Sequence, residues 1–284
     1  MNTIRFDGQV AVVTGSGRGL GAAYARLLAE RGARVVVHDA GVTLDGAGFD
    51  PAVADAEVSA ITAAGGSAVP CYENIETREG CQRVIQTALE HFGRLDILVS
   101  NAGWITYTPL EEMTPALFEH VMQIQIAAPY WLAQAAFATM KQQQYGRIVL
   151  TTSSRALFRE YALPELSGYA VGKMAQLGLM NALAAAGSPF GIHVNAICPV
   201  AATRMLRRAV PERESRPDQV APGVAFLAST QCTFSGAVLI ANNGQFSTLQ
   251  WNEGPEVDFG VETTTPEAIA EQWPVLYSTK RETE

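Results

Sequence analysis

Short apolar runs alternate with longer helical patterns along most of this chain. The runs are continuous in sequence, as in strands that are covered on both faces. They lie at residues 10–13, 34–37, 67–69, 95–99, 147–150, 192–196 and 237–240. Helical patterns occupy 19–31, 52–64, 77–92, 114–142, 165–186 and 217–229. This alternation predicts an α/β fold, a single doubly wound domain with a seven-stranded parallel sheet and helices on both faces.

Residues 245–284 depart from this alternation. They contain Trp251, Trp273 and several prolines, with one short helical pattern after Thr265. No linker rich in Pro, Gly or Ser divides the chain. We therefore expect one domain over 1–284, in which 1–244 form the core and 245–284 form a tail packed on that core or on a partner subunit.

The composition excludes several classes of protein. Of the 284 residues, 48% are hydrophobic and 17% are charged, so the chain is not intrinsically disordered. Its net charge of -8 argues against nucleic acid and anionic membranes as partners. No run approaches the roughly 18 apolar residues that a membrane span needs. The first apolar run is too short for a secretory leader, and we expect a cytoplasmic protein.

Cysteine and histidine do not show the spacing of metal or redox sites. The four cysteines form no CxxC pair, and the four histidines are far apart in sequence. We therefore expect no metal site. The cysteines are typical of small buried residues in a reducing compartment.

A glycine-rich turn follows the first predicted strand. The sequence TGSGRGLG places Gly15, Gly17, Gly19 and Gly21 between that strand and a helix. A helix N-terminus offers free N–H groups and the positive end of a dipole, and glycines let a phosphate approach the backbone closely. A strand before the turn and a helix after it favour dinucleotide binding over a merely flexible loop.

Asp39, at the end of the second predicted strand, bears on the choice of dinucleotide. An acidic residue there accepts hydrogen bonds from the adenosine ribose and repels the extra phosphate of NADP. Arg18 favours the opposite choice, since an arginine attracts that phosphate. With Asp39 facing the same pocket we expect NAD, with NADP as the less favoured alternative. The alternative to a cofactor contact is that Asp39 only caps or forms a turn before Gly41.

Tyr169 and Lys173 form a YxxxK pair on a predicted helix. Residues four apart share one helix face, so the phenol and the ammonium point the same way. A phenol has a pKa near 10, and a nearby cation favours its ionised form, which suits a general acid/base for an alcohol and a ketone. Ser153 and Ser154 follow the strand at 147–150, where a hydroxyl can hold the substrate oxygen or simply form a turn.

Together these motifs resemble the short-chain dehydrogenase/reductase family, whose domain is of the Rossmann type. The resemblance rests on TGSGRGLG, on SNAG at 100–103, and on Ser154, Tyr169 and Lys173 in that order. It implies an oxidoreductase that moves a hydride between a nicotinamide cofactor and a secondary alcohol or ketone. Tyr169 would move the proton, Lys173 would hold the nicotinamide ribose and lower the pKa of Tyr169, and Ser154 would position the substrate oxygen.

The resemblance also implies a set of cofactor contacts. Besides the four glycines and Asp39, these are Arg18, Leu20, Glu73, Asn74, Ile75, Asn101, Ala102, Gly103, Tyr169, Lys173, Pro199, Val200 and Thr203. Glu73 falls where family members hold the adenine. Pro199 shapes the turn after the sixth strand, and Val200 and Thr203 would meet the carboxamide.

Two features depart from the family pattern. Gln125 stands where the family usually has an active-site Asn, which supports a water that links the lysine to solvent through a backbone carbonyl; we expect a rebuilt or weakened proton relay that includes Gln125. The loop between Ser154 and Tyr169 is longer than usual. We expect its residues Arg155 and Phe158, with Trp104 and Met205, to shape the substrate site, although each is also plausible as core or solvated surface.

The long loop after the second strand is similar to that of the (3R)-hydroxyacyl-CoA dehydrogenase units of peroxisomal-type multifunctional enzymes. This resemblance implies a 3-hydroxyacyl-CoA substrate, and Arg204, Arg207 and Arg208 would then meet its phosphates. A free cyclic, aromatic or steroid alcohol is the alternative substrate, and a non-catalytic NAD-binding sensor or subunit is the alternative from another class. The family resemblance further implies a homodimer or homotetramer that pairs through the helices at 114–142 and 165–186 and through the last helix and strand.

Overall fold

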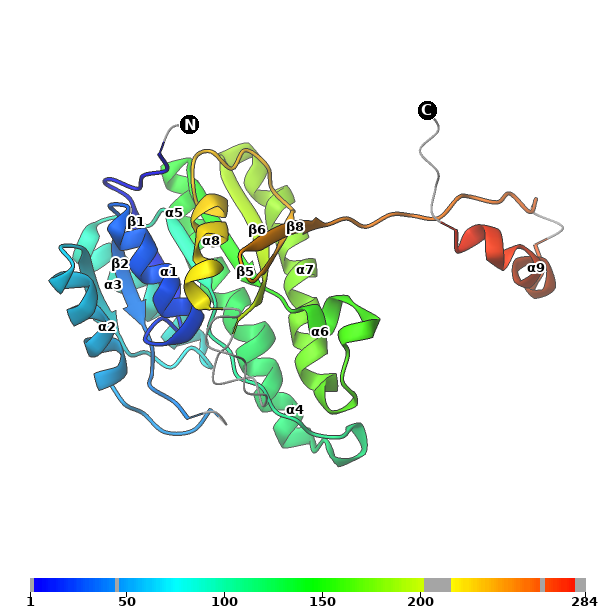
Figure 1. The fold of residues 1–284 in the computed structure, drawn as a ribbon, viewed down its shortest axis with the longest axis horizontal. Coiled ribbons are helices and arrows are strands. Elements are labelled where there is room, and N and C mark those ends of the chain that lie inside the picture. Colours follow the sequence, from blue (N-terminus) through cyan, green and yellow to red (C-terminus); the bar gives the residue numbers. More distant parts are fainter. Residues whose placement is uncertain (1–2, 44–45, 202–215, 261–263, 279–284) are drawn as a thin grey trace. The chain divides into compact units, whose positions relative to one another are not determined.

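A single sheet organises the computed structural model, which describes residues 3–43, 46–201, 216–260 and 264–278. The strand order is β3-β2-β1-β4-β5-β6-β7-β8 (Figure 1). The strands are β1 Val10–Thr14, β2 Arg34–His38, β3 Ser67–Cys71, β4 Ile97–Ser100, β5 Gly146–Thr151, β6 Ile192–Val200, β7 Val238–Asn242 and β8 Gln245–Leu249. Strands β1 to β7 pair in parallel. The order reverses between β1 and β4, and such a switch point opens a crevice at the carboxyl ends of the strands.

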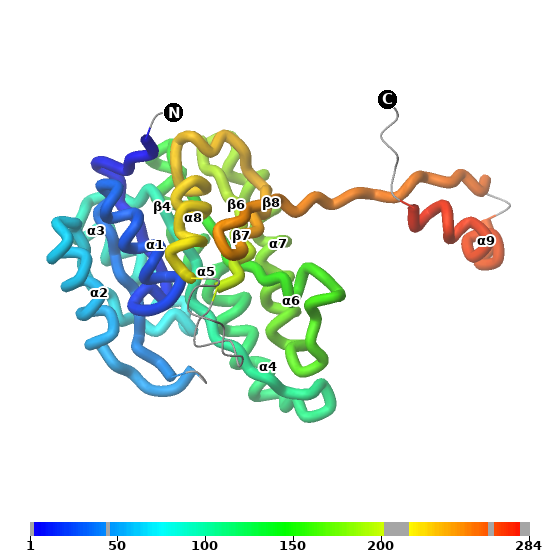
Figure 2. The backbone as a smooth tube through the Cα atoms, viewed as in Figure 1, coloured from blue at the N-terminus to red at the C-terminus, as the bar shows by residue number. Residues whose placement is uncertain are grey.

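Helices cover both faces of the sheet, as predicted. One face carries α1 Gly19–Glu30, α2 Ala52–Ala63 and α8 Ala221–Leu227, and the other carries α3 Arg78–Phe92, α4 Pro115–Met122, α5 Ala128–Gln143 and α7 Ser167–Gly187. Helix α6 Ser154–Leu157 follows β5. Helices α1 and α8, far apart in sequence, pack against each other (Figure 2).

The described part of the sheet has eight strands, not the seven that were predicted. The extra strand, β8, begins where the predicted tail begins. Asn243 and Gly244 connect β7 to β8, and both have positive φ, as the central residues of a type I′ hairpin turn require. Strand β8 is largely exposed and carries mixed polar residues. It therefore lacks the continuous apolar run by which the other seven strands were found.

The sixth strand is longer than predicted because it continues through Pro199 to Val200. Strand β5 pairs with β6 only as far as Ile197, whereas β7 pairs with β6 through Val200. A proline cannot donate to a neighbouring strand, so Pro199 is tolerated where one side of β6 has no partner.

The long helical pattern at 114–142 is a helix with a widened turn. A π-helical turn, Gln123–Ala127, joins α4 to α5, and the N–H of Ala128 donates to the carbonyl of Gln123, five residues earlier. Pro129 explains the widening. It has no N–H for the carbonyl of Gln125 four residues before it, and its ring would crowd that carbonyl in a regular α-helix. Such π-turns are frequent at functional sites.

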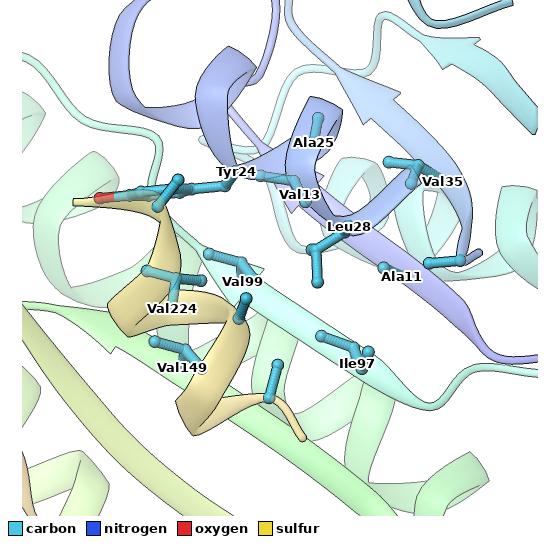
Figure 3. Close-up of a cluster of buried hydrophobic side chains, with 14 of the residues drawn as sticks. Ala11, Val13, Tyr24, Ala25, Leu28, Val35, Ile97, Val99, Val149 and Val224 are labelled. Atoms are coloured by element: carbon cyan, nitrogen blue, oxygen red, sulfur yellow. The ribbon is translucent and has the colours of Figure 1, made fainter. Parts of the chain in front are cut away.

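A large apolar cluster lies between the sheet and the α1–α8 face. Tyr24 and Leu28 of α1 meet Val13 of β1, Val99 of β4 and Val224 of α8 (Figure 3). All are fully buried or nearly so. Burial of each such side chain contributes roughly 1.5–3 kcal/mol, so this cluster fixes the helices that frame the crevice.

Four free thiols lie in different parts of the fold. Cys71 ends β3, Cys81 lies in α3, Cys198 lies in β6 and Cys232 follows α8; all are buried. Burial raises the pKa of each thiol.

The chain divides into two compact units, Met1–Thr248 and Leu249–Glu284. In the second unit, helix α9, Pro266–Leu276, begins after Thr265, whose hydroxyl accepts from the N–H of Ala268. Trp273 stacks on Tyr277 with 6.0 Å between ring centroids. The expected packing of this tail on the core or on a partner stays a prediction.

Candidate active site

Two adjoining pockets, each about 400 Å³, lie at the carboxyl edge of the sheet. The first is at the β1–β4 switch point, and Leu20 and Asn101 line both pockets. The predicted cofactor residues on the first are Gly15, Arg18, Gly19, Leu20, Gly21, Asp39, Glu73, Asn74, Ile75, Asn101, Ala102 and Gly103. Segments from the ends of β1, β2, β3 and β4 therefore meet in one crevice, where dinucleotides bind in such sheets.

The glycines of the turn after β1 allow three segments to pack closely. Gly15 has a φ of +63°, and a Cβ there would stand 2.9 Å from the Cα of Ala102. A Cβ on Gly21 would lie only 2.1 Å from the carbonyl oxygen of Gly15. No other residue fits position 21 without moving the turn, so the sequence TGSGRGLG is required by packing as well as by access of a ligand.

Asn101 ties the end of β4 to the turn. Its side-chain amide donates to the carbonyls of Thr14 and Gly15, at 3.0 and 3.2 Å. The Thr14 hydroxyl accepts from the backbone N–H groups of Asn101 and Ala102. These four bonds hold the two central strand ends in register at the point where the pockets meet.

The carboxylate of Asp39 is held by backbone N–H groups. Its Oδ2 accepts from Gly17 at 2.9 Å and its Oδ1 accepts from Gly41 at 2.8 Å. The carboxylate therefore faces the glycine turn with a fixed orientation, and it lines the first pocket beside Arg18. A Cβ on Gly17 would stand 3.0 Å from Oδ2, so glycine is needed for this contact too.

Glu73 lines the same pocket, but its carboxylate is already paired. Arg83 donates to it at 2.6 Å, while the Glu73 backbone carbonyl faces Nε2 of the buried His38 at 2.8 Å. Burial lowers the pKa of His38, so the neutral ring donates from Nε2. In this arrangement a ligand in the pocket would meet the backbone around Glu73 rather than its paired carboxylate.

The second pocket holds the predicted acid/base pair. It is lined by Leu20, Asn101, Ile105, Tyr107, Thr151, Thr152, Ser153, Ser154, Arg155, Phe158, Tyr161, Tyr169, Lys173, Pro199, Val200, Ala201, Ile240 and Asn242. The ends of β4, β5, β6 and β7, helix α6 and helix α7 thus all contribute to it. Arg155 and Phe158, which we predicted as substrate contacts, line this pocket, and their contact with a substrate stays a prediction.

The hydroxyl next to the Tyr169 phenol is that of Ser153, whereas the sequence prediction chose Ser154. A hydrogen bond from Ser153 lowers the pKa of Tyr169, although burial raises it more. Ser153 is buried, and its oxygen also accepts from the N–H of Arg155 at 3.3 Å. Ser154 begins α6 one residue later and is only half-buried.

Lys173 is buried one helical turn after Tyr169. Its Nζ lies 5.7 Å from the centroid of the phenol ring and donates to the carbonyl of Thr151 at 3.1 Å. Burial lowers the pKa of Lys173 to about 8. The Thr152 hydroxyl donates to the Lys173 carbonyl at 2.8 Å, which fixes this turn of α7 on the end of β5.

Gln125 lies at the π-turn and is fully buried. Its Nε2 donates to the carbonyl of Trp104 at 2.7 Å, and its Oε1 has no hydrogen-bond partner among the described residues. Leaving such an atom unpaired costs about 1–3 kcal/mol. Helix α7 makes room for Gln125 at Gly172, where a Cβ would stand 2.3 Å from the Cβ of Gln125.

Trp104 lies elsewhere than predicted. It lines the first pocket rather than the one with Tyr169, and it is buried. Its ring packs on His120 with 4.7 Å between centroids. Gly46, in the long loop after β2, passes so close that a Cβ there would stand 2.9 Å from Nε1 of Trp104. Thr203 and Met205, and the arginines at 204, 207 and 208, lie outside the described residues.

Sequence reasoning missed several residues of the site. Thr14 gave no motif of its own. Gln176 did give a signal in the sequence, although the prediction did not use it. It is a polar residue in the buried stripe of α7, which also contains Lys173 and Leu177. A polar residue at such a position indicates a specific partner.

Comparisons with known proteins agree with this geometry. The family model described as short chain dehydrogenase matches residues 9–214. That match spans the glycine turn, the whole lining of the first pocket, most of that of the second, and the YxxxK pair. The chain belongs to the short-chain dehydrogenase/reductase family. It is therefore a dehydrogenase that acts on CH–OH groups, and the family binds a nicotinamide cofactor.

Individual relatives of this dehydrogenase include a peroxisomal hydratase-dehydrogenase-epimerase of Saccharomyces cerevisiae, 35% identical over 275 residues. The match covers 95% of the chain but 30% of that relative, so the chain spans about a third of a multifunctional protein. A crystal structure of a short chain dehydrogenase from Mycobacterium avium superposes with a TM-score of 0.84 and 32% identity, covering 97% of this chain and 98% of that one.

A metagenomic short-chain oxidoreductase in complex with NADP superposes with a TM-score of 0.70 and 29% identity, over 83% of this chain and 97% of that one. Within the described residues, no group of His, Cys, Asp and Glu has the arrangement of a metal site. In the same residues, no helix has the length and apolar character that crossing a membrane requires.

Proposed function

We propose that this dehydrogenase interconverts a secondary alcohol and a ketone with NAD, and that Tyr169 is the general acid/base. The observation that carries the proposal is the buried cluster of Tyr169, Lys173 and Ser153 on the wall of the second pocket. When bound, the oxidised cofactor would supply the hydride acceptor for alcohol oxidation, and its reduced form NADH would supply the hydride donor for ketone reduction. The residues of the chain supply the proton transfer and the positions of the reacting groups.

The proton step follows from the surroundings of Tyr169. In alcohol oxidation the phenolate oxygen takes the hydroxyl proton of the substrate, and in ketone reduction the phenol returns it. The Ser153 hydroxyl favours phenolate by donating to it, and a protonated Lys173 favours it by charge. Ser153, beside the phenol, is positioned to hold the substrate oxygen, a role that we assign to it in place of Ser154.

The choice of NAD rests on Asp39. A carboxylate anchored by two backbone N–H groups cannot turn away from the pocket, so it would face the added phosphate of NADP as a fixed like charge. Two free carboxylate lone pairs remain for a ribose diol. Arg18 lines the same pocket, and we propose that the fixed charge of Asp39 outweighs it in the selectivity.

For the substrate we propose a 3-hydroxyacyl-CoA ester, on the resemblance to the dehydrogenase units of multifunctional enzymes and on the position of Arg155. This residue lies on the wall of the second pocket, where a guanidinium can meet a phosphate. A specific observation favours a free aromatic or alicyclic alcohol as the second candidate. Phe158 and Tyr161 meet edge to face at 5.9 Å beside the catalytic group and form an apolar wall.

The decisive experiment measures cofactor reduction with NAD and with NADP, separately. The panel contains a (3R)-hydroxyacyl-CoA, cyclic and aromatic secondary alcohols, and a hydroxysteroid. We expect turnover with NAD that falls at least about 100-fold in Tyr169→Phe, while NAD binding persists. Full turnover by Tyr169→Phe would refute the role of the phenol. Binding of NAD without turnover of any alcohol would instead support the non-catalytic sensor.

We also propose that the dehydrogenase is a homodimer or homotetramer paired through α4, α5 and α7. These helices expose large apolar side chains to solvent, namely Phe118, Tyr130, Val171 and Met174. Large apolar side chains that gather on exposed helix faces are typical of interaction sites, and this supports the proposal. Sedimentation at micromolar concentration tests the proposal, and a monomer alone would refute it.

A further inference from the structure

We infer that Gln176 is a positioning residue for the reaction: its side-chain amide holds the open carbonyl of Gln125 and thereby keeps Oε1 of Gln125 aimed at Lys173. The inference rests on the proposed role of the Tyr169–Lys173 pair. It concerns a residue of α7 that lines neither pocket and touches no reacting group.

The starting point is the carbonyl oxygen of Gln125. Pro129 cannot donate to it, so the α-helical bond that would satisfy it is absent. The carbonyl belongs to a fully buried residue, where water is excluded. Nε2 of Gln176 donates to this oxygen at 2.5 Å, from a side chain that is only 3% exposed. A residue on α7 therefore replaces the backbone donor that α5 lacks.

Hydrogen-bond chemistry fixes the orientation of both side-chain amides. A carbonyl oxygen accepts only from a donor, so Nε2 of Gln176 must face the Gln125 carbonyl and Nε2 of Gln125 must face the Trp104 carbonyl. The Oε1 of Gln125 consequently points the other way. It is a buried acceptor without a partner among the described residues.

Gly103 shows which groups lie near the side-chain amide of Gln125. The point where a Cβ of Gly103 would stand lies 3.3 Å from Nε2 and 3.5 Å from Oε1 of Gln125, and 3.6 Å from Nζ of Lys173. The side-chain amide and the ammonium thus border the same small space, which glycine keeps open. An ammonium has three donors, and the bonds of the described residues give Nζ one acceptor, the Thr151 carbonyl. Oε1 of Gln125 is the next acceptor at hand.

The charges near this pair come from few groups. The lowered pKa of Lys173 has burial as its cause, with no contribution from a charged neighbour. The titratable groups that act on Tyr169 are Tyr107, Arg155 and Cys198, from the β4–α4 loop, α6 and β6. The elements that border Nζ itself offer the Thr151 carbonyl and Gln125, both uncharged. An acceptor turned toward Nζ therefore stabilises the ammonium, and the ammonium favours the phenolate.

The sign of the expected effect follows directly. Without the Gln176 donor the π-turn relaxes, Oε1 of Gln125 turns from Nζ, and the ammonium loses an acceptor. The pKa of Lys173 then falls further and that of Tyr169 rises. In alcohol oxidation the rate grows as Tyr169 loses its proton, so the acidic limb of the pH–rate profile moves to higher pH. A merely structural role would lower stability without moving that limb.

The experiment compares pH profiles of kcat for Gln176→Leu and Gln176→Met with those of the wild type, using NAD and the alcohol found to turn over. Both variants keep a side chain of similar volume, lose the donor and add no charge. We expect the acidic limb to move up by about half a pH unit or more, with the KM for NAD within about twofold. Met180→Leu, a buried change on the same helix, is the control and should leave the limb in place.

A double-mutant cycle with Gln125→Met makes the test independent of folding losses. If Gln176 acts through Gln125, the double variant shifts the limb no further than Gln125→Met alone. Additive shifts, or superimposable profiles for the Gln176 variants and the wild type, would overturn the inference. A wild type that turns over no alcohol, or a fully active Tyr169→Phe, would instead overturn the proposed function.

Discussion

Nζ of Lys173 lies 5.7 Å from the ring centroid of Tyr169 and donates a hydrogen bond to the Thr151 carbonyl at 3.1 Å; among the bonds of the described residues it donates to neither the phenol nor a carboxylate. The lysine is thus a buried cation near a phenol, stabilised by a backbone dipole. Burial of such a cation lowers the stability of the folded protein. The same cation is useful for acid/base chemistry, because its positive charge favours the phenolate form of Tyr169.

The cost of this lysine should be measurable as stability. Burial lowers its pKa from 10.5 to about 8, so between these values the unfolded chain binds more protons and the free energy of unfolding rises with pH. Below about pH 8 the full cost applies, about 3 kcal/mol. We expect Lys173→Met to unfold at higher urea concentration than the wild type near neutral pH, with the gap closing toward about pH 10.

The control for that measurement is Lys141→Met, since Lys141 is an exposed lysine near the end of α5. It should not change the slope of stability with pH. Lys173→Met should also lose at least about 100-fold in turnover. Equal pH dependence of stability in Lys173→Met and the wild type would show that the lysine is not desolvated in the folded protein.

A matched pair of serines tests which hydroxyl serves the substrate. Ser153→Ala removes a donor to the phenol and an acceptor for the Arg155 N–H, whereas Ser154→Ala alters a half-buried residue at the start of α6. We expect kcat to fall by about 100-fold in Ser153→Ala and by less than about threefold in Ser154→Ala. Steady-state kinetics with NAD decides, and the reverse order would restore Ser154 to the role.

Asp39 should control cofactor preference. Replacing it with serine removes the fixed negative charge while leaving a small polar group beside Gly17. We expect the ratio of kcat/KM for NAD to that for NADP to fall by about 100-fold or more, which corresponds to about 2.7 kcal/mol. Asp50→Ser, which alters an exposed aspartate just before α2, is the control. An unchanged ratio in Asp39→Ser would transfer the selectivity to Arg18.

Two glycines of α7 should respond oppositely to alanine. A Cβ at Gly172 would overlap the Cβ of Gln125 at 2.3 Å, whereas a Cβ at Gly178 would meet nothing within 4 Å. We expect Gly172→Ala to lower stability by about 1–3 kcal/mol through overpacking. Gly178→Ala should raise it by about 0.5–1 kcal/mol through helix propensity. Thermal unfolding of both variants compares them, and equal shifts would contradict the tight contact at Gly172.

The fold could be predicted largely from continuous apolar runs, because strands buried on both faces carry an unambiguous pattern. The prediction failed where that condition lapses. Strand β8 lies at an edge of the sheet. The Asn243–Gly244 pair is a hairpin signal that precedes it, but the prediction did not use that signal. Strand β6 continues past Pro199 only because β5 has already ended, a fact of register that no local pattern contains.

The site could be predicted as far as its motifs reach. The glycine turn, Asp39, Asn101, Tyr169 and Lys173 converge as expected. The choice between Ser153 and Ser154 depends on the path of the chain after β5, and spacing alone gave the wrong neighbour for the phenol. Trp104 was assigned to the substrate site because it follows the SNAG turn in sequence. In the structure it packs against His120 and the loop at Gly46, and it lines the first pocket.

The four buried thiols can report how often each part of this protein opens to solvent. Each is shielded from solvent and has a raised pKa, so an alkylating reagent reacts only after the surrounding structure opens. Cys71 and Cys81 report on the half of the sheet that forms the nucleotide crevice, and Cys198 and Cys232 report on the half beside the phenol. The relative rates of their modification would show which half of the sheet opens more readily, and no engineered cysteine would be needed.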